Sequence, residues 1–172
     1  MKRARTVIIG YAAVWGDLAR RDDGWVQIRR GAFSTDAAAV SETRPLPMHW
    51  DHQSQGLFSA AKIPVGAIVE LREDKHGLFM RAFPHVSQDA IDLMEAIRDR
   101  TVHGLSVAYD TMTAEFEELP KLGRVVVTKA PLVEISAVNH PAFKLTDVRL
   151  AQEDYDDGEP EPAEMQSAAP AA

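Results

Sequence analysis

Residues 132–138 read Leu-Val-Glu-Ile-Ser-Ala-Val, and this apolar, β-branched run is typical of a buried strand. One carboxylate, Glu134, lies inside it. The two-residue period of a strand puts Val133 and Ile135 on the opposite face from Glu134. Burying a carboxylate is costly unless the group is paired or hydrogen-bonded. We therefore expect a specific partner for Glu134.

Two kinds of partner would satisfy this carboxylate. A histidine would make the pair functional, because a carboxylate that accepts the imidazole N–H fixes the tautomer and stabilises the imidazolium. An arginine such as Arg124 or Arg149 would instead make a structural ion pair. The strand alone leaves both alternatives open.

A second strand, residues 105–111, opens at Gly104 and carries Ser106 beside Ala108 on a face of small residues. A nucleophilic hydroxyl needs an open position of this kind, because the substrate must come within reacting distance. A strand serine that merely faces solvent would give the same pattern. Ser106 is thus a candidate nucleophile only in combination with other groups.

Two histidines and an aspartate lie within residues 46–52, Leu-Pro-Met-His-Trp-Asp-His. His49, Asp51 and His52 could ligate a metal, but no second cluster would complete the site, so we expect no metal. The same residues could lie in an exposed turn. A third possibility is that one histidine is the general base of a triad with Ser106 and Glu134.

The rest of the pattern is dominated by strands, with few helices. Ser34 and Ser87 are the expected N-caps of the two helices, and Pro131 must lie at an edge or a bulge because it cannot donate to a ladder. This favours an α+β fold with a mostly antiparallel, barrel-like core and one or two flanking helices. The expected strands are 6–15, 25–30, 46–50, 65–71, 77–83, 105–111 and 124–138, and the expected helices are 35–42 and 88–100.

The charge of the chain is concentrated at its C-terminal end. Seven of the 26 acids and none of the 19 bases lie in residues 151–172, so residues 1–150 are neutral. Acid, Pro, Ala and Ser dominate those 22 residues, which predicts a disordered tail after a single domain, 1–150. The neutral domain has no basic stripe, so we expect no nucleic-acid partner.

Composition narrows the remaining chemistry. The chain has no cysteine, which excludes disulfides and thiol nucleophiles. No apolar run approaches the length of a membrane span, and the N-terminus lacks the pattern of a signal peptide. We therefore expect a cytoplasmic protein without a membrane partner, and no motif indicates a cofactor.

The chain resembles the prohead proteases of tailed bacteriophages, the capsid-maturation proteases. The resemblance rests on an ordered series of short motifs over residues 7–149. They are Gly-Tyr-Ala-Ala-Val-Trp-Gly at 10–16, Arg-Gly-Ala-Phe at 30–33, Pro-Met-His-Trp-Asp-His at 47–52, Pro-Val-Gly at 64–66, Gly-Leu-Phe-Met at 77–80, Gly-Leu-Ser-Val-Ala-Tyr at 104–109 and Leu-Val-Glu-Ile-Ser-Ala-Val-Asn-His-Pro-Ala at 132–142.

The resemblance implies a fold distantly similar to the herpesvirus maturation protease and a serine endopeptidase activity. The family's base falls on His52, its nucleophile on Ser106 and its carboxylate on Glu134, whereas His49 stands where the family has an apolar residue. Arg30 replaces a proline of the family pattern. His140 is a further departure and a rival third member, because the herpesvirus relatives use a second histidine in place of a carboxylate.

The resemblance also implies the setting of the reaction. The substrates would be the major capsid protein and a scaffold segment, cleaved inside an assembling procapsid in the bacterial host cytoplasm, by an enzyme that could be a homodimer. The particle could be a phage, a prophage remnant or a gene transfer agent. The alternative is a catalytically silent module that keeps the protease fold and binds capsid subunits, since resemblance transfers a fold more securely than an activity.

Overall fold

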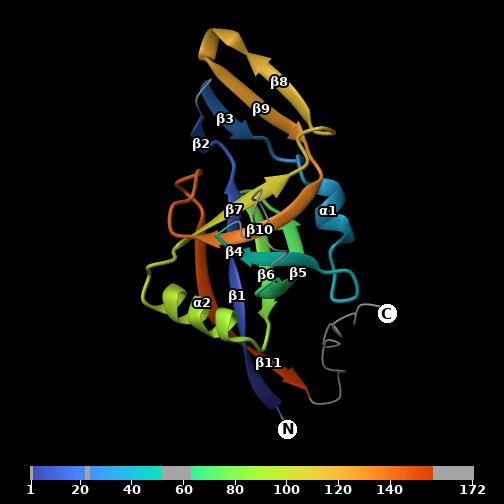
Figure 1. Ribbon diagram of the computed structural model, residues 1–172. Helices are drawn as coiled ribbons and strands as arrows, with labels where there is room; N and C mark the ends of the chain where they lie inside the picture. Colours follow the sequence, from blue (N-terminus) through green and yellow to red (C-terminus); the bar gives the residue numbers. More distant parts are fainter. Residues whose placement is uncertain (1, 22–23, 52–62, 157–172) are drawn as a thin grey trace, which may run out of the picture.

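The computed structural model describes residues 2–21, 24–51 and 63–156. In these residues the chain forms two β-sheets, two α-helices and one 3₁₀ turn (Figure 1). None of the helices in the described ranges is both long and apolar enough to cross a membrane.

The larger sheet has seven strands and contains the candidate site. All neighbouring strands are antiparallel except β4 and β10, which run parallel. In order across the sheet the strands are β11 (Asp147–Asp156), β1 (Lys2–Val14), β6 (Gly77–Pro84), β5 (Gly66–Glu73), β4 (Leu46–Trp50), β10 (Leu132–Val138) and β7 (Gly104–Tyr109).

The sheet curls so that its edge strand β7 returns toward β1 and β11 at the other edge. The Leu105 amide donates to Thr146 Oγ1 at 3.3 Å, and the Val148 amide donates to the His103 carbonyl at 3.3 Å. Side chains from the inside of the curl, among them Ile8, Met48 and Leu105, are fully buried and form the core. The predicted barrel-like α+β fold is confirmed.

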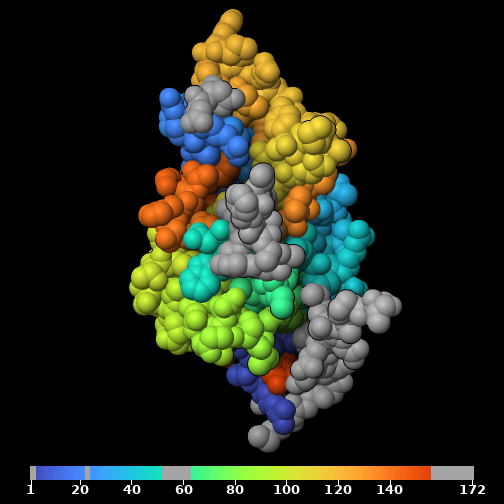
Figure 2. Space-filling model, in the orientation of Figure 1, coloured from blue at the N-terminus to red at the C-terminus, as the bar shows by residue number. Residues whose placement is uncertain are grey.

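The second sheet has four strands and forms one end of the molecule, drawn in blue and orange in Figure 2. In order they are β2 (Leu18–Arg21), β3 (Gly24–Ile28), β9 (Arg124–Lys129) and β8 (Glu115–Leu119), and the 3₁₀ turn η1 (Pro120–Leu122) joins β8 to β9. The prediction of one strand over 124–138 was therefore wrong. Pro131 lies where the chain leaves one sheet for the other, and its carbonyl accepts the Asp110 amide at 2.9 Å.

The two helices begin differently. At α2 (Gln88–Arg98) the predicted cap is confirmed, since Ser87 Oγ accepts the Ala90 amide at 3.3 Å. At α1 (Ser34–Ala39) the predicted cap was wrong, because Ser34 is already inside the helix and no side chain caps it. The carboxylate of Glu73, from β5, instead accepts amides just before this helix, including that of Phe33 at 3.0 Å.

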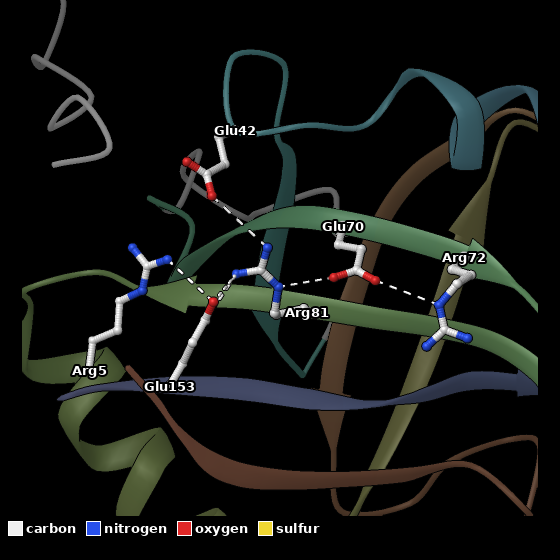
Figure 3. A network of polar contacts seen from close by, with 6 residues as sticks. All are labelled: Arg5, Glu42, Glu70, Arg72, Arg81 and Glu153. Carbon is white, nitrogen blue, oxygen red and sulfur yellow. Dashed lines mark hydrogen bonds and ion pairs between the residues drawn. The ribbon is translucent and has the colours of Figure 1, made fainter. Parts of the chain in front are cut away.

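A network of ion pairs joins the first and last strands to the β5–β6 hairpin (Figure 3). Arg81 lies at its centre and contacts Glu70 at 3.0 Å, Glu153 at 3.1 Å and Glu42 at 4.0 Å. Arg5 reaches Glu153 at 3.6 Å. Because these contacts link β1, β5, β6 and β11, the network stabilises the pairing of both chain ends with the body.

The prediction of a disordered tail from residue 151 was wrong for its first six residues. β11 continues to Asp156 and pairs with the start of β1, where Arg5 lies opposite Glu153. Acids that looked like part of a solvated tail therefore complement the basic start of the chain. The remainder of the predicted tail, 157–172, lies outside the described residues.

Cutting β11 short should destabilise the domain. A chain that ends at Leu150 loses the strand partners of residues 2–7 and the Glu153 ion pairs, whereas a chain that ends at Asp156 keeps all of β11. We expect the shorter chain to have a free energy of unfolding lower by about 2 kcal/mol or more, measured by urea denaturation. Equal stability of the two truncated chains would contradict the role given to β11.

The position of β7 should depend on the absence of a side chain at Gly104. A Cβ built there would lie 2.6 Å from Cγ of Pro141, so Gly104→Ala must displace the strand or the ring. We expect a loss of about 1–3 kcal/mol in the free energy of unfolding. The double variant Gly104→Ala/Pro141→Ala should regain part of that loss relative to the sum of the single changes. Strictly additive effects would show that the predicted contact does not act.

Candidate active site

Three adjacent strands bring a histidine and two serines into one row. In the register of the sheet, His49 of β4 lies opposite Ser136 of β10, which lies opposite Ser106 of β7. Residues directly opposite each other are about 5 Å apart and project from the same face. The reverse face of these strands carries core residues such as Met48 and Ile135, so the row lies on the face that points away from the core.

A β-bulge in β10 brings Glu134 onto the face of Ser106. Leu132 pairs with Tyr109 but Glu134 pairs with Ala108, so β10 has one extra residue, Val133, at this point. Without this extra residue the register of β10 against β7 would shift by one, and Ser106 would lie opposite Ile135 instead of Ser136. Val133 is 49% exposed, whereas Ile135 is fully buried, as expected for an extra residue that the partner strand does not match.

The contacts of Glu134 include a serine and a histidine. Its side chain is 1% exposed, and Ser136 Oγ donates to its Oε1 at 3.0 Å. His49 Nε2 lies 3.7 Å from its Oε2. The arginines considered as partners pair elsewhere: Arg124 donates to Gln27 and Arg149 to Asp147. The sequence allowed a histidine or an arginine as the partner of Glu134, and the residue that lies 3.7 Å from it is a histidine.

The predicted base, His52, lies outside the described residues. The chain leads toward it from the end of β4, where the Asp51 amide donates to the Ala137 carbonyl at 2.9 Å and Asp51 has a left-handed backbone, with φ of 60°. Asp51 itself is exposed. Among the residues described, no group of three His, Asp or Glu side chains is arranged to hold a metal ion.

The two candidates for the third member of the triad lie in different surroundings. Glu134 is buried on the face of Ser106, whereas His140 is exposed and lies two residues beyond the end of β10. Ser106 is half-buried, next to the buried Ala108. The geometry therefore places Ser106 and Glu134 on one face, whereas His140 lies in the bend that follows β10.

Two residues of this arrangement were not predicted as part of the site. Ser136 was not singled out from the sequence, and the family resemblance assigned the base to His52 rather than to His49. The two-residue spacing from Glu134 was the available signal for Ser136. For His49 the sequence had no comparable signal, because its place depends on the parallel pairing of β4 with β10, in which paired residues are 87 apart in the sequence.

A hydroxyl, a carboxylate and an imidazole on one face of a sheet are the groups that acyl transfer uses. The carboxylate orients an imidazole, the imidazole takes the hydroxyl proton, and the oxygen attacks a carbonyl carbon. Ser106 lies on the edge strand β7, and Glu134 lies one strand inward. The arrangement is therefore competent for nucleophilic catalysis once a base is within reach of Ser106.

The fold is shared with solved herpesvirus proteases. A structure of the Kaposi's sarcoma-associated herpesvirus protease with an allosteric inhibitor has a TM-score of 0.50 at 14% identity, covering 86% of this chain and 76% of that one. A second, with a hexapeptide phosphonate inhibitor, has a TM-score of 0.52 at 14% identity, covering 85% of this chain and 64% of that one. At this identity the likeness establishes the fold alone.

The family follows from the sequence as a whole. A comparison with curated proteins finds no match. The profile of the caudovirus prohead serine proteases matches residues 1–160, and the chain therefore belongs to the caudovirus prohead serine protease family.

Proposed function

We propose that this capsid-maturation protease is a serine endopeptidase that cleaves capsid or scaffold segments during procapsid maturation of a tailed phage or phage-like particle. The observation that carries the proposal is the placement of Ser106 and the buried Glu134 on one face of neighbouring strands. Membership in a family of prohead serine proteases supports the serine type.

In the proposed mechanism Ser106 is the nucleophile, His52 the general base and Glu134 the group that orients the base. His52 takes the hydroxyl proton as the Ser106 oxygen attacks the peptide carbonyl. Glu134 stabilises the imidazolium, and the histidine then returns the proton to the leaving amine. In the sequence His52 lies two residues after the end of β4, and β4 places His49 beside Glu134.

The setting that we propose follows from the family. The substrates are the major capsid protein and a scaffold segment, and the reaction takes place inside the assembling procapsid in the host cytoplasm. A herpesvirus protease of the same fold has been solved in complex with a dimer disruptor. We propose that this chain also acts as a homodimer.

Replacing the nucleophile should abolish cleavage without unfolding the domain. Ser106 is half-buried at a strand edge, so Ser106→Ala removes little packing. We expect the rate at which a co-expressed major capsid protein from the same particle is cleaved to fall by a factor of about 10³ or more. Intact-mass spectrometry of the capsid protein measures that rate. Continued cleavage by Ser106→Ala would show that Ser106 is not the nucleophile.

The two histidines give the internal contrast. His52→Ala should lower the cleavage rate as much as Ser106→Ala, whereas His49→Ala should leave a measurable rate, and a chelator should not inhibit the wild type. An equal loss in both histidine variants together with inhibition by the chelator would favour a metal site. An unprocessed capsid protein in mature particles, despite the wild-type chain, would favour the silent assembly module.

A further inference from the structure

Ser136 is a fully buried polar side chain in the middle of the candidate site. It lies between Ser106 and His49 in the row across the three strands. Its hydroxyl donates to Glu134 Oε1 at 3.0 Å, and that carboxylate is itself buried. Since a buried hydroxyl and a buried carboxylate each need a partner, the two groups satisfy each other.

Residue 136 also separates the groups on either side of it. Positions directly opposite in neighbouring strands are about 5 Å apart, so a side chain at 136 occupies the space between Ser106 and His49. A serine is small enough to leave that space open. The position thus combines two requirements, a hydrogen-bond donor and a small side chain.

We infer that Ser136 is a positioning residue for proteolysis, which holds the carboxylate of Glu134 in the orientation that the base requires. The inference rests on the proposed function, because it needs Glu134 to act in the reaction. Hydrogen bonds to a charged acceptor are stronger than neutral ones, so the hydroxyl favours the ionised carboxylate and restricts its rotation. The His49 ring lies beside the other carboxylate oxygen, with Nε2 3.7 Å from Glu134 Oε2.

Loss of this donor should slow the chemical step and leave binding unchanged. Without the hydroxyl, Oε1 loses a hydrogen bond in a site where water is excluded, so the carboxylate is less well oriented and less stable as an anion. Ser136 is 0% exposed and therefore does not touch a substrate. The effect must reach Ser106 through Glu134 and the base.

The test uses the full-length chain and an active-site probe, diisopropyl fluorophosphate, with the intact mass as the readout of labelling. Three variants distinguish the effect of the hydrogen-bond donor from the effect of side-chain size. Ser136→Ala removes the hydroxyl, Ser136→Thr keeps it, and Ser136→Val has the shape of threonine without the hydroxyl. We expect the maximal labelling rate to fall about 10- to 100-fold in the Ala and Val variants. The Thr variant, which keeps the donor but adds the same bulk as Val, should be labelled at least about 10-fold faster than the Val variant, with the probe's half-saturating concentration unchanged in all.

The outcomes separate this inference from the proposed function. Equal rates for the Thr and Val variants, or a wild-type rate for Ser136→Ala, would overturn the role of Ser136 while labelling of Ser106 in the wild type upholds the proposed function. If the labelling rate of Ser136→Ala falls only by the fraction of that variant that is unfolded, as measured by thermal unfolding, the role of Ser136 would also be overturned. A wild-type chain that is not labelled at Ser106 would overturn both.

Discussion

The structure depends on how one buried carboxylate is held. An ionised carboxylate inside a protein is tolerated only when hydrogen bonds, oppositely charged groups or polarisable groups replace the water that hydrates it outside. Glu134 meets this condition through Ser136 on its own strand and His49 on the parallel strand beside it. The register of β4 against β10 and the position of the bulge at Val133 are therefore constrained together, since a shift of one residue would carry these groups to opposite faces.

The position of Ser106, the proposed nucleophile, depends on contacts at the start of β7. Thr146 accepts the Leu105 amide, and Gly104 lies so close to Pro141 that no Cβ fits between them. These contacts join the edge strand to the segment that follows β10. Because β10 and the turn after it hold β7 from two sides, Ser106 and Glu134 are positioned by the same stretch of chain. Packing and chemistry are thus coupled in residues 132–146.

Much of the fold could be predicted from residue periodicity, because strands such as 46–50 and the hairpin around residue 75 are set by local alternation and turn residues. The division of residues 124–138 between two sheets could not, since it depends on which partners each half finds. The β11 strand was hidden for a similar reason: acids such as Glu153 look solvated until β1 presents Arg5 opposite them. Local composition cannot report a partner more than 140 residues away.

The candidate site was predictable in its residue types and less so in its geometry. Glu134 could be singled out because a carboxylate in an apolar strand demands an explanation, and the structure gives it buried polar contacts. Its common face with Ser106 could not be derived, because an unbulged β10 would have placed the two on opposite faces. His52 stays a prediction from family resemblance, and the structure places His49 beside the carboxylate.

The most direct measurement is a crystal structure of the chain after reaction with a peptide phosphonate. The account predicts a bond between phosphorus and Ser106 Oγ, with a histidine ring nitrogen within hydrogen-bonding distance of that oxygen and Glu134 in contact with the same ring. Phosphorus on any other residue, or a histidine at Ser106 that is oriented by His140 while Glu134 takes no part, would contradict it.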